Sequence, residues 1–356
     1  MRKGRLQFNS AFRIPHFALV GATLLLVLSE CARDHRTPLV VYSPHGRDLL
    51  TLFEHRFEAL HPDVDVRWLD MGSQDVYDRV RSERANPQAD VWFGGPSLIL
   101  AQAAGDSLLD CYRPSWAGAI AARGRGPGDC YFAAYETPAV FLYAEKVVKP
   151  EEAPQDWDDL LNPKWKGKLI IRDPLASGTM RAVFGLIMLR EQKQPGDTAS
   201  GFAWLRRLDG QTKEYVQNPA LISEKIARQE ALVTVWDLPD VLISRRRGMP
   251  VGYVFPRSGT VAIEDGIAVV RGAKHAAAAR AYVDFVGSVA MQLAAAREVY
   301  RLPARLDLPV DSLPEWVRDV RRRMVVTDVD WNLLAEHGPE WMRWWDQHVR
   351  GTGGRR

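Results

Sequence analysis

The stretch that decides the fold is residues 39–60, LVVYSPHGRDLLTLFEHRFEAL. Its first four residues are apolar and predict a buried strand, which a Ser-Pro-His-Gly turn ends at Gly46. Residues 48–60 predict a helix, because apolar residues recur there at the spacing of one helix face. The residues of that face are Leu49, Leu50, Phe53, Phe57 and Leu60. The stretch is therefore one strand–turn–helix unit.

The same unit recurs further along the chain. Residues 64–69 alternate like a half-buried strand, and residues 74–83 follow as a helix. Residues 90–93 predict a third strand, which Gly94-Gly95-Pro96-Ser97 ends before another helix. Strands that alternate with helices predict an α/β fold with a parallel or mixed sheet.

Two turns lie where such a fold holds ligands. In open α/β sheets a ligand binds beyond the carboxyl ends of the strands. The turn after the first strand brings Ser43 and His45 to that edge, where both could donate to a ligand, although a histidine in such a turn is also compatible with plain exposure to solvent. The turn after the third strand brings Gly94 and Gly95, whose backbone N–H groups face the same edge.

A third turn has the chemistry of an anion site. Ser177-Gly178-Thr179 follows a predicted strand, residues 168–172, and precedes an amphipathic helix from Met180 to about Glu191. Two hydroxyls, free backbone N–H groups and the helix dipole suit phosphate, phosphonate or carboxylate, and Gly178 would let the backbone approach closely. The alternative is that Ser177 or Thr179 only caps the helix.

Residues 1–30 predict export. Basic residues precede the apolar run of residues 17–28, which is shorter than the roughly 20 residues of a spanning helix and has the length of a secretory signal. Cys31 after this run resembles the lipobox of bacterial lipoproteins, which implies that Cys31 is acylated and that a lipid anchor is the contact with the membrane. Glu30 stands where that motif usually has a small residue, so cleavage nearby, leaving a soluble periplasmic protein, stays open.

Export also changes the meaning of the charge. The chain has 47 basic and 44 acidic residues, but residues 1–30 hold four of the former and one of the latter, so 43 of each remain. A neutral chain argues against a nucleic-acid partner, which would need a clustered basic face. The arginine triplets at residues 245–247 and 321–323 are expected at solvated helix ends.

The cysteines fit an oxidising compartment. With Cys31 set aside, Cys111 and Cys130 are the two that remain, and they predict one disulfide around a glycine-rich loop; two buried free thiols are the alternative. The sequence shows no CxxC or Cys/His cluster, so neither a metal nor another cofactor is expected. It also contains no GxSxG, HExxH or P-loop pattern, and we expect a binding protein and not an enzyme.

Six segments in order carry a resemblance to one family over roughly residues 38–350. The chain resembles the family-1 extracellular solute-binding proteins of ABC transporters, in the branch of ferric-iron-type, hexose-phosphate and phosphonate binders. The segments are LVVYSPHG, ANPQADVWFGG, WDDLLNPKWKGKLIIRDPLASGT, SGTVAIEDGIAVVRGAKHAAAARAYVDF, YRLPAR and DVDWNLLAEHGPEWMRWWDQHV.

The resemblance implies a fold and its partners. The expected fold is a type II clamshell of two lobes, each with a mixed sheet flanked by helices, and the ligand lies in the cleft between them. Lobe 1 would hold residues 38–136 plus 256–305, and lobe 2 residues 137–255 plus 306–356. The lobes would close around the ligand by hinge motion, and a permease in the inner membrane would receive it. The family also implies a monomer.

The resemblance implies further site residues. The chain would cross between lobes at residues 135–137 and 254–256, which brings Tyr135 and Thr137 to the cleft. Trp236 and Asp237 match the family segment that carries an acidic cleft residue; Asp237 could accept from sugar hydroxyls or pair with an amine, and Trp236 could stack on a ring or simply pack.

The expected cargo is a small organic anion, such as a phosphonate or sugar phosphate. Ferric iron is the first alternative, because iron carriers of this branch typically present adjacent tyrosines. The chain has ten tyrosines without a Tyr-Tyr pair, and Arg297 and Arg301 flank Tyr300, where they would repel a cation. A second alternative is a co-receptor that hands its liganded form to a signalling protein.

Overall fold

The computed structural model describes residues 35–352, of which residues 37–352 belong to one compact unit. The predicted signal, residues 1–30, and Cys31 lie outside the described residues. Among the helices of the described part, none has both the length and the apolar character that a membrane span requires.

The first strands build a parallel sheet, as the sequence predicts. β1 (Thr37–Ser43) pairs in parallel with β2 (Val64–Asp70) and β3 (Val91–Pro96). β3 extends through Gly94 and Gly95, which adopt φ values of +100° and +95°, so the expected end of this strand at Gly94 was too early. The helices between these strands are α2 (Arg47–Leu60), α3 (Ser73–Ser82) and α4 (Ser97–Gly105).

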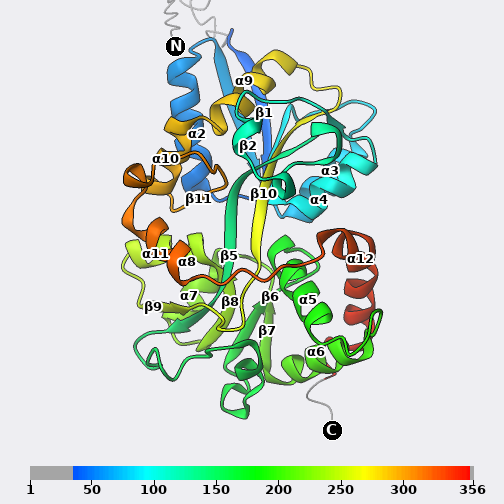
Figure 1. Ribbon diagram of the computed structural model, residues 1–356, viewed down its shortest axis with the longest axis vertical. Coiled ribbons are helices and arrows are strands. Elements are labelled where there is room, and N and C mark those ends of the chain that lie inside the picture. Colours follow the sequence, from blue (N-terminus) through cyan, green and yellow to red (C-terminus); the bar gives the residue numbers. More distant parts are fainter. Residues whose placement is uncertain (1–34, 353–356) are drawn as a thin grey trace, which may run out of the picture. The chain divides into compact units, whose positions relative to one another are not determined.

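Two long strands connect the two ends of the sheet. β5 (Phe132–Ala144) pairs antiparallel with β10 (Ala262–Val270), and β10 also pairs antiparallel with β3. The first part of β5 carries β11 (Leu302–Pro303), and its last part carries β8 (Val233–Asp237) and β9 (Val251–Val254). The sheet is therefore mixed, and β5 belongs to both of its halves (Figure 1).

The second half of the sheet repeats the α/β pattern. β6 (Leu169–Arg172) lies parallel to β7 (Thr212–Val216) and to β8. The strand order across both halves is β2-β1-β3-β10-β5-β8-β6-β7, with β4 (Leu109–Asp110), β9 and β11 beside this path. Its helices are α5 (Gly178–Arg190), α6 (Ala199–Gln211), α7 (Leu221–Ala227) and α8 (Leu238–Arg246). The predicted boundaries of the two lobes along the chain stay predictions.

The last helices complete both halves. They are α9 (Ala276–Val286), α10 (Val289–Glu298), α11 (Glu315–Arg323) and α12 (Trp331–His348). Short 3-10 turns are η1 (Ala117–Ala119), η2 (Ala122–Gly124), η3 (Pro127–Asp129), η4 (Trp157–Leu161), η5 (Pro163–Trp165) and η6 (Val310–Ser312). α12 packs against both α4 and α5, so the end of the chain contacts helices from both halves (Figure 1).

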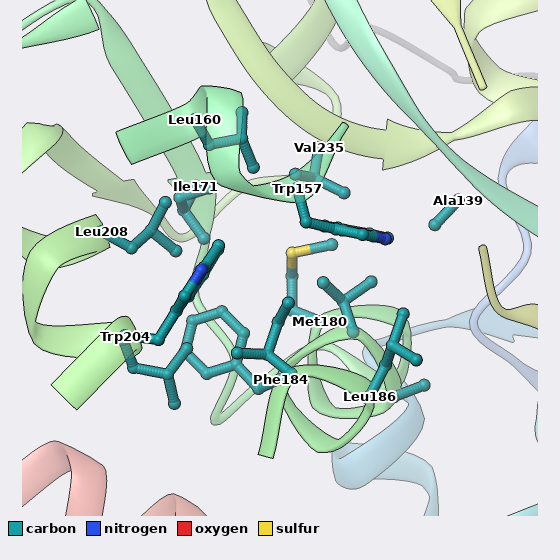
Figure 2. Packing of buried hydrophobic residues seen from close by; sticks show 14 of the residues in the cluster. Ala139, Trp157, Leu160, Ile171, Met180, Phe184, Leu186, Trp204, Leu208 and Val235 are labelled. Atoms are coloured by element: carbon teal, nitrogen blue, oxygen red, sulfur yellow. The ribbon is translucent and has the colours of Figure 1, made fainter. Parts of the chain in front are cut away.

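The core of the second half fixes the start of α5. Met180, in the first turn of α5, is fully buried in an apolar cluster with Trp157, Phe184 and Trp204 (Figure 2). The indole N–H of Trp157 donates to the Gly259 carbonyl at 2.9 Å, which holds this ring in place. The beginning of α5 is thus set by close packing, because a well-packed core resists displacement.

Several sequence predictions are confirmed at residue level. Four of the five residues assigned to the core face of α2 are buried, whereas Leu60 is 68% exposed because the helix ends there. The arginine triplets end α8 and α11, as expected. Cys111 and Cys130 form the predicted disulfide, which closes the loop that contains η1, η2 and η3.

We predict that replacing both Cys111 and Cys130 by serine lowers the free energy of unfolding by ~3 kcal/mol, because the cross-link restricts a loop of this length in the unfolded chain. Urea denaturation of oxidised wild type and of the double variant measures the difference. Reduction of the wild type under native conditions should reproduce it. Equal midpoints with and without the disulfide would contradict the prediction.

Candidate functional site

A cavity of about 100 Å³ lies between the two halves of the sheet. Its first wall comes from the carboxyl ends of β1, β2 and β3 and the residues that follow them, and its second wall from those of β6, β7 and β8. Thr137 on β5, Asp265 on β10 and Arg301 before β11 close it from the connecting strands. The cavity therefore lies at the carboxyl ends of the parallel strands, where α/β sheets hold their ligands.

Five helices of the described chain begin at this cavity. The residue that precedes the first turn lines the cavity in each case: Gly46 for α2, Gly72 for α3, Pro96 for α4, Ser177 for α5 and Asp237 for α8. The first N–H groups of a helix have no acceptor within the helix, and its dipole places partial positive charge there. Their convergence makes the cavity attractive to an anion.

The predicted Ser-Gly-Thr turn has two roles. Ser177 Oγ accepts from the Met180 N–H at 3.3 Å, so the capping role is real for this residue. Its hydroxyl hydrogen remains able to donate into the cavity. Thr179 Oγ1 donates to Asp237 Oδ2 at 3.3 Å, and α5 begins at Gly178, two residues earlier than expected. Of the two hydroxyls, that of Ser177 is the better placed to bind an anion.

Gly178 brings the two walls together. A Cβ on Gly178 would lie 2.6 Å from both Cδ and Cγ of Pro96, which belongs to the opposite wall. Gly72 makes the reciprocal approach, since a Cβ there would lie 2.9 Å from the Ala176 carbonyl oxygen. Any side chain at either position would separate the walls, so these glycines allow the cavity to be sealed.

Two buried arginines add full positive charge. Arg172 ends β6 and is 5% exposed; its guanidinium donates to the Val216 carbonyl at 3.1 Å and lines the cavity. Arg301 is also 5% exposed, and its Nε has no hydrogen-bond partner among residues 35–352. A buried donor without a partner is costly, so it indicates a group that a ligand completes.

Three carboxyl groups line the same cavity. Asp265 is buried and accepts from the Thr137 hydroxyl and the Gly95 N–H, and its burial raises the pKa. Burial raises the pKa of Asp237 well above its usual range, and the charges of Asp240 and Asp265 add to this effect. Burial likewise raises the pKa of Asp240, although Arg301 opposes the shift. The three carboxyl groups are thus close enough to disfavour one another's ionisation.

His45 is buried and neutral. It is 5% exposed, its backbone N–H donates to Ser43 Oγ at 3.1 Å, and its ring packs edge-on against Phe93. Burial lowers the pKa of this histidine well below the usual range, and the charge of Arg301 lowers it further. Its Nε2 has no partner within the described chain, so the ring offers a neutral polar atom beside the cavity.

The structure brings together seven of the eleven predicted ligand residues. Those that line the cavity are His45, Thr137, Ser177, Gly178, Thr179, Trp236 and Asp237. The other four do not line the cavity. Ser43 Oγ accepts from the His45 backbone N–H, the Gly95 backbone N–H donates to Asp265, and Gly94 lies against the His45 ring. Tyr135 is fully buried in the core of the first half, with a hydroxyl that lacks a partner among the residues described.

Sequence reasoning missed Arg172, Asp240, Asp265 and Arg301 as site residues. Asp240 follows Asp237 by one turn of α8, so its helical spacing was a signal that could have found it. Arg301 lies in the YRLPAR segment, whose place beside the cavity follows from the pairing of β11 with β5. Glu264 and Asp265 do point apart, as expected for neighbours in a strand: Glu264 binds Arg123 at 2.8 Å and Asp265 faces the cavity.

We also looked for residues of the described chain that could bind a metal ion. Between residues 35 and 352, no group of three or more His, Cys, Asp and Glu side chains is arranged to hold a metal ion. The three cavity aspartates do not form such a group, and the charge of Arg301 lowers the pKa of each of them.

The fold defines a type II periplasmic binding protein. A family model described as "Bacterial extracellular solute-binding protein" matches residues 114–336, and the chain belongs to this family. The predicted family and the extracytoplasmic location are confirmed, together with the fold class.

Individual relatives agree with this assignment. A protein of Sinorhizobium fredii named as a periplasmic-binding protein of an ABC transporter is 24% identical over 98% of this chain and 97% of its own. A Salmonella typhimurium protein named for periplasmic binding of 2-aminoethylphosphonate is 27% identical over 69% of this chain and 71% of its own. The solved structure of AfuA from Actinobacillus pleuropneumoniae, with fructose-6-phosphate bound, is 24% identical, covers 88% of this chain and 99% of its own, and has a TM-score of 0.79.

We predict that Gly178→Ala weakens solute binding at least tenfold, because its methyl group meets Pro96 and separates the walls. The unfolding midpoint of the solute-free protein should not fall, since alanine favours a helix over glycine by roughly 1 kcal/mol. Gly338→Ala is the matched control: it lies inside α12 with open space around it. That variant should keep full affinity by calorimetry. Equal affinity of both variants would contradict the role of Gly178.

We also predict that Asp237→Asn stabilises the solute-free protein at pH 7 by a few degrees in Tm. The pKa of Asp237 is raised on folding, so its ionisation costs stability as the pH rises. The Asp237 side chain makes no capping hydrogen bond to α8, so asparagine loses none there, and its side-chain oxygen can still accept from Thr179. The gain should shrink as the pH falls toward 4. Exposed Asp311→Asn is the control and should leave Tm unchanged. A pH-independent effect would contradict this account.

Proposed function

We propose that this protein is the solute-binding subunit of an ABC uptake transporter and that it captures a small organic anion with a phosphonate or phosphate group. The observation that carries the proposal is the convergence of five helix N-termini on one cavity beside Arg172. The anion would accept from free N–H groups at the start of α5, from the Ser177 hydroxyl and from Arg172. Such donors suit an oxyanion with several acceptor atoms.

The relatives support this proposal. One is named for an ABC transporter and another for 2-aminoethylphosphonate, and a structure of the same fold holds a sugar phosphate. We propose that this protein likewise binds its solute without changing it chemically. Closure of the two walls would bury the solute, and a membrane permease would receive it from the closed form. We propose that the protein acts as a monomer.

The chemistry of the cavity disfavours ferric iron. Iron(III) prefers several anionic oxygen ligands around one ion. None of the tyrosines in residues 35–352 lines the cavity, and its three aspartates are not arranged to hold a metal ion. Two buried guanidinium groups also face it, and their charge would repel a trivalent cation. An anion is instead attracted by both guanidinium groups.

A thermal-shift panel tests the proposal. Ethylphosphonate, 2-aminoethylphosphonate, fructose-6-phosphate, inorganic phosphate, citrate and Fe(III) are each added to the protein. A ligand at 100 times its Kd stabilises the folded state by ~2.7 kcal/mol, which gives a clear shift. We expect at least one phosphonate or phosphate ester to shift Tm. A shift with Fe(III) alone would overturn the proposal.

The variant Arg172→Gln locates the anion. We expect it to weaken every phosphonate or phosphate ligand of the panel at least tenfold, because it removes a buried charge–charge interaction. The exposed Arg84→Gln is the matched control and should bind like wild type. Unchanged affinity in Arg172→Gln would remove this arginine and the neighbouring α5 turn from the site.

A further inference from the structure

The cavity contains more carboxyl groups than an anion site needs. Three carboxyl groups, of Asp237, Asp240 and Asp265, face two guanidinium groups. A solute with only an anionic group would bring a further negative charge close to these carboxyl groups. Like charges close together in a poorly solvated site repel strongly. The acidic residues therefore oppose the proposed anion unless the solute also brings positive charge.

The carboxyl groups are only partly satisfied by the protein. Asp237 accepts from Thr179 through Oδ2, while its buried Oδ1 has no partner among the described residues. Asp240 accepts from the Trp236 indole, and Asp265 accepts from Thr137 and Gly95. Arg301 is the one buried cation whose charge acts on all three, and its own Nε is unpartnered within the part described. The Asp237 oxygen and the Arg301 Nε, an acceptor and a donor, thus each lack a partner that a solute could supply.

The protein's own compensation is incomplete. The α8 dipole favours negative charge at Asp237 and Asp240, because both lie at the start of that helix. Arg301 acts in the same direction. Even so, burial prevails and the pKa of each of the three carboxyl groups is raised. An added cation of the solute would restore ionisation of the carboxyl groups and use the free Asp237 oxygen.

The volume limits the solute. The cavity of about 100 Å³ is smaller than the ~150 Å³ apolar cavity that holds one benzene molecule. A sugar phosphate has more than twice as many non-hydrogen atoms as 2-aminoethylphosphonate, so the present walls favour the smaller solute.

We propose that the solute is a short zwitterion, whose ammonium group binds between Asp237, Asp240 and Asp265 while its phosphonate or phosphate group binds at the start of α5. This inference rests on the proposed function and assigns the opposite end of the same cavity. Thr179 joins the two ends, since it belongs to the first turn of α5 and its hydroxyl holds Asp237.

Calorimetry with two matched phosphonates tests the ammonium subsite. The pair is 2-aminoethylphosphonate and ethylphosphonate, which share the anionic group and differ in the amine. We expect wild type to bind the amino compound at least tenfold more tightly. Asp237→Asn should remove most of that preference, because it weakens binding of the amino compound and strengthens binding of ethylphosphonate, whose anionic group no longer meets the Asp237 carboxyl group. Asp311→Asn, on the surface, should retain the full preference.

The outcomes separate the two proposals. If both phosphonates bind wild type equally, the zwitterion inference is wrong and the proposed function stands. If neither binds and no other phosphate ester of the panel does, both are wrong. If Asp237→Asn does not fold, Asp240→Asn makes the same test from the next turn of α8. A preference for the amine that survives both substitutions would overturn the assignment of the subsite.

Discussion

The constraint on which the structure depends is that five helices must begin at one cavity. Their first N–H groups cannot be satisfied within the helices, so the strands have to end at the same edge and the intervening turns have to be short. β5 makes this arrangement possible, because it carries strands of both halves and brings their carboxyl ends together. The packing of Met180 against Trp157 then holds the start of α5 in its place.

Much of the fold could be predicted from local pattern. Short apolar runs predicted the strands before His45 and Gly94, and helical periodicity predicted the buried face of α2. The turns that follow parallel strands share an edge, so His45 and the Ser177-Gly178-Thr179 turn could be placed at one site without coordinates. These predictions succeeded because each depends on residues that are near one another in the sequence.

The rest of the site could not be predicted for a physical reason. Arg172 and Asp265 lie on strands, and which face of a strand meets a cavity depends on register with distant strands. Arg301 reaches the cavity only because β11 pairs with β5, about 165 residues earlier in the chain. Tyr135 shows the converse: it lies near the cavity, but the pairing of β5 with β10 leaves its side chain in the core of the first half. In each case, the pairing of strands that are far apart in the sequence determines whether the side chain reaches the cavity.

The three buried aspartates are not explained by anion binding alone. A site built only for an anion would gain nothing from burying Asp237, Asp240 and Asp265, because each raises the energy of the solute-free protein. Arg301 reduces this cost without removing it. The walls meet at Gly72 and Gly178, so closure excludes the water that would otherwise solvate these charges. Closing therefore becomes favourable when a solute supplies both signs of charge, and the same groups that make the empty cavity unfavourable make it selective.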